Sequence, residues 1–127
     1  MKQLLFFLFL WMLSACQNKA DDMVGIWKVN DRFTKASYQI EQDGRYLKAF
    51  VLAYDDGTTQ YKFDGSKKHY AFTGLKHKKG VYVDGVSGAT SKTENPKNYA
   101  IKKKHKDTLE VTTYILNKPI IETWIRK

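Results

Sequence analysis

The sequence predicts an all-β fold, a small antiparallel up-and-down meander that closes into a barrel of about eight or nine strands. From residue 23 onward, the chain lacks the apolar spacing of an amphipathic helix. Apolar and polar side chains instead alternate with a period of two, as they do in half-buried strands. Gly, Asp and Asn separate these runs, and Asp-Gly pairs are typical of the tight turns between neighbouring strands.

Each expected strand is a short β-type run with turn residues at its ends. The nine expected strands are residues 24–30, 37–42, 45–54, 58–63, 69–73, 81–83, 98–104, 108–115 and 120–126. The expected turns are residues 43–44, 55–57, 64–65, 76–80, 105–107 and 116–119, and the one long loop is 84–96. Residues 47–54 are apolar on both faces, which predicts the most buried strand.

Closure of the sheet is favoured because an open meander has two free edges, and free edges promote aggregation. The first and last runs each carry a tryptophan, Trp27 and Trp124. We therefore expect the first strand to pair with the last and close the barrel.

The first strand carries a motif of a known family. Gly25-Ile26-Trp27 resembles the Gly-x-Trp that opens the first strand of lipocalins. In that family the tryptophan packs at the closed end of the barrel against a basic side chain from the last strand. The resemblance therefore implies that Arg126 contacts Trp27 through a cation–π interaction, which contributes about 0.5 to 2 kcal/mol. The family's middle motif, Thr-Asp-Tyr, is absent and the chain is shorter than a typical lipocalin, so a large ligand cavity is not implied.

Aromatic side chains are expected to fill the interior, because small barrels are packed with side chains. The candidates for the inner face are Tyr38, Phe50, Tyr61, Phe63, Phe72, Tyr82 and Tyr99. They line either a solid core or a small pocket for a small apolar ligand. The first alternative makes the barrel an envelope-structural module, and the second makes it a ligand-binding module.

The amino-terminal segment is typical of a bacterial lipoprotein signal. Residues 1–15 contain a charged start and an apolar run over 4–13, which is too short to span a membrane. Leu13-Ser14-Ala15-Cys16 resembles the lipobox. That resemblance implies cleavage before Cys16, a diacylglyceryl thioether on its sulfur, and acyl chains such as palmitate. The alternative is an ordinary secretory signal followed by an unrelated cysteine.

This interpretation divides the chain into a signal peptide (residues 1–15), a lipidated cysteine with its tether (16–23) and a β-barrel domain (24–127). Gln17, in the second mature position, resembles the sorting signal of lipoproteins that go to an outer membrane. The expected location is therefore the cell envelope, with the barrel lipid-anchored to the outer membrane, on its periplasmic face or at the cell surface. The membrane is the expected partner.

The composition is basic, with 22 Lys and Arg against 13 Asp and Glu and a formal net charge of +9. A basic surface attracts anionic lipid headgroups, acidic polysaccharides or nucleic acid. Nucleic acid is not an expected partner, because the lysines lack the interleaved aromatic residues on which single strands stack. Cys16 is the single cysteine, so the barrel holds no internal disulfide and depends on packing.

The usual catalytic and metal-binding patterns are absent from the sequence. His69, His77 and His105 are dispersed, and two of them lie in basic segments that repel a divalent cation. There is no nucleophile elbow, phosphate-binding loop or suggestive pair of carboxylates. We therefore expect neither a metal site nor enzymatic activity.

One segment indicates a different function. Asp84-Gly85-Val86-Ser87-Gly88-Ala89-Thr90 resembles the flavinylation motif of the FMN-binding domains of the Nqr and Rnf respiratory complexes. The resemblance implies that the phosphate of FMN is esterified to Thr90, and the rest of the cofactor-binding motif is then Asp84, Ser87, Gly88 and Ala89. The chain would act as an extracytoplasmic electron carrier with covalent FMN. The alternative is a flexible polar loop and no cofactor.

Overall fold

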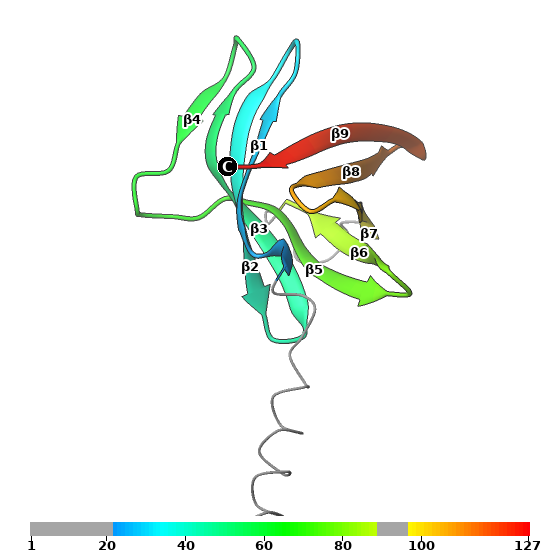
Figure 1. Ribbon diagram of the computed structural model, residues 1–127. Helices are drawn as coiled ribbons and strands as arrows, with labels where there is room; N and C mark the ends of the chain where they lie inside the picture. The colour runs from blue at the N-terminus through cyan, green and yellow to red at the C-terminus, as the bar shows by residue number, and fades with distance from the viewer. Residues whose placement is uncertain (1–21, 89–96) are drawn as a thin grey trace, which may run out of the picture.

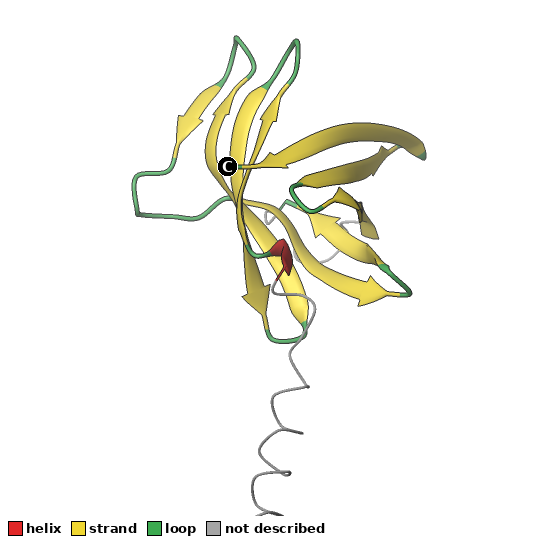
Figure 2. Ribbon diagram, in the orientation of Figure 1, coloured by secondary structure: helices red, strands yellow, loops and turns green. Residues whose placement is uncertain are grey.

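The computed structural model describes residues 22–88 and 97–127, and within them it confirms the predicted all-β class. Figure 1 shows the order of the strands, and Figure 2 shows that strands dominate the fold. Eight antiparallel strands close a barrel, and a ninth, short strand lies beside it. The strands are β1 (Gly25–Asn30), β2 (Lys35–Asp43), β3 (Tyr46–Asp55), β4 (Gln60–Lys62), β5 (Tyr70–Lys78), β6 (Val81–Ser87), β7 (Lys97–His105), β8 (Thr108–Ile115) and β9 (Lys118–Arg126).

The chain runs up and down, and consecutive strands are neighbours in the sheet except for β4 and β5. One edge of β3 pairs with β2 along the whole strand. Its other edge pairs with β4 at residues 53–55 and with β5 at residues 47–50. The barrel therefore passes directly from β3 to β5, and β4 extends the sheet outside it.

The expected pairing of the first strand with the last is confirmed. The paired segment between the two strands is short. β1 and β9 are in register at two positions, one of which places Trp27 opposite Arg126. The Lys127 amide adds a hydrogen bond of 2.9 Å to the Ile26 carbonyl. Beyond this crossing the two strands diverge, as Figure 1 shows.

The two ends of the barrel differ. The closed end carries the turns after β2, β5 and β7 and the segment that leads into β1. Met23 in that segment is fully buried and packs in the core, so its side chain covers this end. The other end, which we call distal, carries the turns after β1, β3 and β8.

Aromatic rings from β2, β5, β7 and β9 form a layer inside the barrel. Tyr38 stacks on Trp124, with ring centroids 4.3 Å apart and planes 3° from parallel. Phe72 lies 6.2 Å from Trp124 and 5.2 Å from Tyr99. Full burial of one large apolar side chain stabilises a protein by about 1.5 to 3 kcal/mol. This aromatic layer is therefore a main contribution to the stability of the fold.

The aromatic residues expected on the inner face divide into two groups. Four of them pack in the core or against it: Tyr38, Phe72, Tyr82 and Tyr99. Tyr61 and Phe63 are outside the core, because they lie on β4 or directly after it. Since β4 is not part of the barrel, its side chains have no access to the interior.

Phe50 was also expected inside, and the structure places it on the outer face. Leu47 and Ala49 occupy the inner face of β3, so strand alternation turns Phe50 outward. It is still buried, because the ring of Phe63 packs against it at 5.3 Å and the ammonium group of Lys68 lies 4.6 Å from its centroid. A strand that is apolar on both faces does not reveal from sequence which face is the inner one.

Several expected turns have different boundaries in the structure. Asp43 pairs with Tyr46 at the end of β2, so the turn consists of Gly44, with a φ of 61°, and Arg45. Other residues expected in turns or in the long loop belong to strands: 76–78 to β5, 84–87 to β6, His105 to β7 and 118–119 to β9. The outer face of a barrel contacts water, so charged residues are compatible with a strand there as well as with a turn.

Candidate functional site

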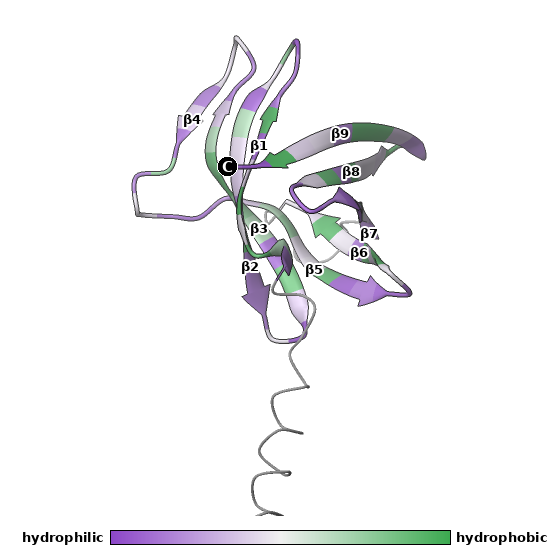
Figure 3. Ribbon diagram, in the orientation of Figure 1, coloured by the Kyte–Doolittle hydropathy of each residue, from purple (hydrophilic) through white to green (hydrophobic). Residues whose placement is uncertain are grey.

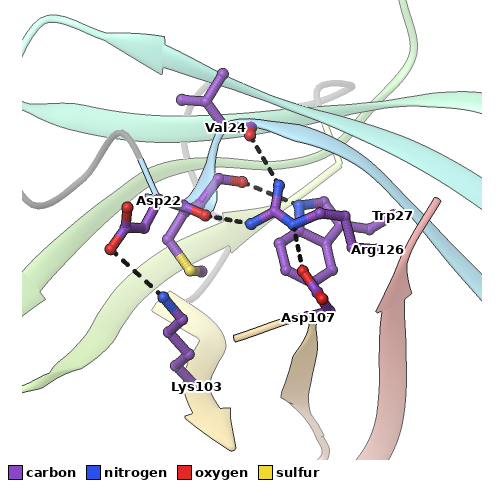
Figure 4. Close-up of polar contacts among 7 residues, drawn as sticks. Asp22, Val24, Trp27, Lys103, Asp107 and Arg126 are labelled. Atoms are coloured by element: carbon purple, nitrogen blue, oxygen red, sulfur yellow. Dashed lines mark hydrogen bonds and ion pairs between the residues drawn. The ribbon is translucent and has the colours of Figure 1, made fainter. Parts of the chain in front are cut away.

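The two residues expected to close the barrel, Trp27 and Arg126, are in contact at the closed end (Figure 4). The guanidinium carbon of Arg126 lies 4.3 Å from the centroid of the Trp27 ring. The indole Nε1 of Trp27 donates a hydrogen bond of 2.9 Å to the Met23 carbonyl. The fully buried tryptophan therefore also fixes the segment that precedes β1.

Hydrogen bonds from Arg126 join three parts of the chain. Its Nη1 and Nη2 donate to the carbonyls of Val24 and Asp22, the first over 3.2 Å. Its Nε donates to the Asp107 carboxylate over 3.1 Å. Hydrogen bonds from a charged group are roughly twice as strong as neutral ones. Lys103 adds an ion pair of 3.5 Å to the side chain of Asp22, also visible in Figure 4.

The position of the Arg126 guanidinium also explains Gly25, the first residue of the Gly-x-Trp motif. Its φ is 142°, in the region that favours glycine. A Cβ atom at this position would lie 2.9 Å from Nη1 of Arg126. The backbone angle therefore favours glycine here, and any larger residue would also displace the guanidinium of Arg126.

On the distal side of the aromatic layer, a carboxyl group faces the interior. Glu122 lies two residues before the buried Trp124 on β9 and therefore points in the same direction. Burial raises the pKa of Glu122, and repulsion by the Asp31 carboxylate adds to the effect. Glu122 makes no salt bridge with any residue that the structure describes. Among residues 22–88 and 97–127, this half-buried acid therefore has no compensating cation.

Tyrosines surround this carboxyl group. Burial raises the pKa of three tyrosine hydroxyls, and the negative charge of Glu122 raises each pKa further. The three residues are Tyr38, Tyr54 and Tyr99. Trp124 is 1% exposed, and its Nε1 has no hydrogen-bond partner within residues 22–88 and 97–127. The interior near Glu122 is therefore polar but incompletely paired.

A cleft of about 700 Å³, which we call the basic cleft, lies on the outer face of β1, β2, β3 and β4. Four lysines line it, Lys28, Lys35, Lys62 and Lys127, against one acidic side chain, Asp55. Neutral polar or small side chains complete much of the lining, among them Asn30, Ser37, Ala53 and Gln60. The cleft is therefore suited to an anionic ligand.

Strand register explains the shape of the basic cleft. Lys28 lies opposite Ser37, Ser37 opposite Ala53, and Ala53 opposite Lys62, across four adjacent strands. The two middle side chains are short and the two outer ones are long, so the row forms a trough with a cation on each side. Three inter-strand spacings separate Lys28 from Lys62, which is about 14 Å.

Sequence reasoning missed this cleft, because its residues come from four strands and form no local motif. The register also depends on a bulge between Ser37 and Tyr38, which shifts β2 against β3. Such an irregularity changes which residues share a face and is not visible in an alternating pattern.

The structure describes part of the flavinylation motif. Asp84 lies inside β6 with a φ of 63°, and its carboxylate is 2.9 Å from the Lys76 ammonium group. The hydrogen bond from Lys76 lowers the pKa of Asp84. Asp84 therefore belongs to the strand and not to the long loop that the sequence suggested.

The next motif residues lie where β6 ends. The Ser87 amide donates to the side-chain oxygen of Asn98 over 3.1 Å, and the Asn98 amide group donates to the Ser87 hydroxyl over 3.0 Å. The Gly88 amide donates to the Ala71 carbonyl over 3.2 Å. Ala89 and Thr90 lie outside the described residues.

The remaining predictions concern the histidines, metal binding and the membrane anchor. His69 and His77 each contact a tyrosine ring at 5.0 Å. Among the described residues, no group of three or more His, Cys, Asp or Glu could hold a metal ion. The described part of the chain has no helix with the length and apolarity to cross a membrane. Cys16 lies outside it.

The closing contact can be tested by mutation. Trp27→Ala should lower the free energy of unfolding by about 3 to 5 kcal/mol, because it removes a large, fully buried side chain. Arg126→Ala should cost less, about 1 to 3 kcal/mol, since water replaces part of its hydrogen bonding. Arg126→Lys keeps the positive charge but loses the planar guanidinium and its several donors. Its free energy of unfolding should lie between those of Arg126→Ala and wild type. Urea denaturation measures all three, and an unchanged Trp27→Ala protein would contradict this role.

The pKa of Glu122 leads to a pH-dependent prediction. Because this pKa is raised above the reference value of 4.5, the folded protein loses stability as pH rises from about 4.5 through the folded pKa. Glu122→Gln removes that loss, so in dilute solution it should stabilise the protein at pH 7 and not at about pH 4. Thermal unfolding at both pH values measures the difference. An equal gain at both would indicate a cause other than ionisation.

No protein-family model matches the chain, and neither curated proteins nor solved structures give a significant match.

Proposed function

We propose that this chain is a lipid-anchored, lipocalin-like lipoprotein of the cell envelope that binds a small acidic ligand in the basic cleft. The observation that supports it best is the cleft itself, with its four lysines and its volume of about 700 Å³. Small-molecule sites commonly occupy roughly 300 to 1,000 Å³. The barrel serves as a rigid scaffold for binding and has no enzymatic role.

The cleft selects the ligand by the spacing of its charges. The strands that carry Lys28 and Lys62 are about 14 Å apart. We therefore expect a ligand with negative charge at two separated points. The short side chains of Ser37 and Ala53 leave room for an extended body between them. Nearby amide side chains can bond to hydroxyl groups on that body. An acidic oligosaccharide combines these properties.

The interior supports a small apolar ligand less well. The rings of Tyr38, Trp124 and Phe72 lie in contact across it, and all three residues are buried. Small barrels with filled interiors act as scaffolds, and their binding surfaces lie elsewhere. We therefore place the ligand on the outer face.

The proposed anchor is consistent with access to this cleft. Asp22 lies at the closed end, where its carbonyl accepts a hydrogen bond from Arg126. Six peptide units separate it from Cys16, a distance of at most about 20 Å. A lipid on Cys16 would thus hold the closed end toward the membrane and leave the side of the barrel open to polymers of the envelope.

Titration calorimetry with a defined probe tests the cleft. Tri-galacturonic acid should bind, and more weakly at high salt. Maltotriose, the neutral trisaccharide, should not bind. Lys28→Gln with Lys62→Gln should weaken binding about tenfold or more, and the same pair of changes at Lys67 and Lys79, outside the cleft, should have little effect.

Ala53→Leu separates a shaped site from a merely basic surface. It fills the floor of the cleft without changing the charge. Binding should fall about tenfold if the ligand enters the cleft, because an added side chain occupies its space. Undiminished binding in Ala53→Leu, or equal loss from both lysine pairs, would contradict the proposed site.

The lipid anchor has its own test. Cys16→Ser should release the protein from the membrane fraction, because two or more acyl chains supply an affinity that a basic surface alone does not. Fractionation should include a high-salt wash, which removes purely electrostatic attachment. A Cys16→Ser protein that remains bound after the wash would refute the anchor.

Covalent FMN at Thr90 remains a second candidate. The observation that favours it is the paired hydrogen bonding between Ser87 and Asn98, which fixes the chain where the motif leaves β6. Protein co-expressed with a flavin transferase should gain the mass of FMN minus water, and Thr90→Ala should abolish the gain without loss of stability. Intact mass spectrometry decides, and an unmodified mass excludes this function.

A further inference from the structure

β9 has a free edge along most of its length. β1 pairs with it at two positions near its end, so residues 118–124 have no strand on that side within the described part of the chain. The Lys127 amide bonds toward β1, and alternate residues of a strand direct their backbone groups the same way. The amides of Ile121 and Thr123 therefore point toward the free edge.

The β8–β9 hairpin also exposes large apolar side chains near its turn. They are Tyr114, Ile115, Leu116, Ile120 and Ile121. Leu116 is 91% exposed and Ile121 is 61% exposed. Figure 3 shows the apolar stretch on β9 beyond its crossing with β1. An apolar patch beside an open strand edge is typical of an interaction surface.

We propose that this edge pairs with the β9 edge of a second copy of the chain, in antiparallel orientation, to form a two-fold symmetric dimer. The two β8–β9 hairpins then form one continuous sheet. The exposed isoleucines of both copies are covered, and the free amides of both edges find partners. A two-fold interface requires a self-complementary surface, and β9 provides one.

Charge complementarity identifies the second copy as the partner. Lys118 and Glu122 lie on the same face of β9, on either side of Ile120. If Ile120 of each copy lies opposite Ile120 of the other, Lys118 lies directly opposite Glu122. If Ile121 lies opposite Ile121, the same two residues are diagonal neighbours. In both registers Glu122 gains a cation that the described part of its own chain does not supply.

A lipid bilayer is a poorer partner for this surface. It would cover the apolar side chains, but hydrocarbon leaves the edge amides of Ile121 and Thr123 without hydrogen bonds. The hydrocarbon would also provide no cation for Glu122. The dimer proposal does not depend on the basic cleft or on the identity of its ligand.

Disulfide crosslinking of the full-length protein in bacterial membranes tests the pairing. Each of the two registers places a different residue opposite its own copy, Ile121 in one and Ile120 in the other. Opposite Cα atoms are about 5.5 Å apart for Ile121→Cys and about 4.5 Å apart for Ile120→Cys, and both are within disulfide range. Mild oxidation should convert most of one of these two variants to a covalent dimer. Ile125→Cys is the matched control, because the same strand carries it but β1 pairs with it. That control and the wild type should remain monomeric.

A dimer of Ile125→Cys at the same yield would show random collision. A disulfide between Ile121→Cys and another protein, in place of the dimer, would show that the edge binds a different partner.

A charge exchange tests the register independently. Lys118→Glu and Glu122→Lys each place like charges together, which is destabilising across a sheet, and should weaken dimerisation about tenfold in detergent by sedimentation. The double variant restores opposite charges and should recover most of the affinity. Circular dichroism checks that each variant is folded. Single variants that dimerise as well as wild type, or a folded double variant without recovery, would refute the proposal.

Discussion

The contact between Arg126 and Trp27 reinforces the barrel where its ring of strands is weakest. β2 and β3 are in register at nine positions, whereas β1 and β9 are in register at two. Hydrogen bonds from the same guanidinium to Asp22, Val24 and Asp107 tie the entry segment and the turn after β7 to the last strand. The Arg126 side chain therefore contributes both to closure of the sheet and to the packing of the closed end.

This closure has a consequence for where ligands can bind. Aromatic rings occupy the interior, so the barrel presents its chemistry mainly on the outer face. There the basic cleft is built from the long and short side chains of four strands in register. Glu122 is the exception, because it is an acid held inside without a cation from the described chain. A half-buried carboxyl of this kind costs stability unless something outside the monomer compensates it.

Local patterns predicted the fold class, because strand alternation and Asp-Gly turns are properties of neighbouring residues. The pairing of first and last strands followed from the need to cover two open edges. The sequence could not show that β4 lies outside the barrel or that Phe50 faces outward, since both depend on which strands pair and in what register. The basic cleft has the same origin, because the bulge at Ser37 and Tyr38 fixes which side chains face each other. Cys16 and Thr90 lie outside the described residues, so their chemistry stays a prediction.

The sequence separation of the strand pairs also affects how the barrel folds. The hairpins β2–β3, β5–β6, β7–β8 and β8–β9 join strands that follow one another, whereas β1 and β9 join residues 27 and 126. Loop-closure entropy makes such distant contacts slow to form. The pairing of β1 with β9 is therefore expected to form late. Until it forms, the edge of β9 that carries the exposed isoleucines is unpaired along its whole length, which favours aggregation during folding.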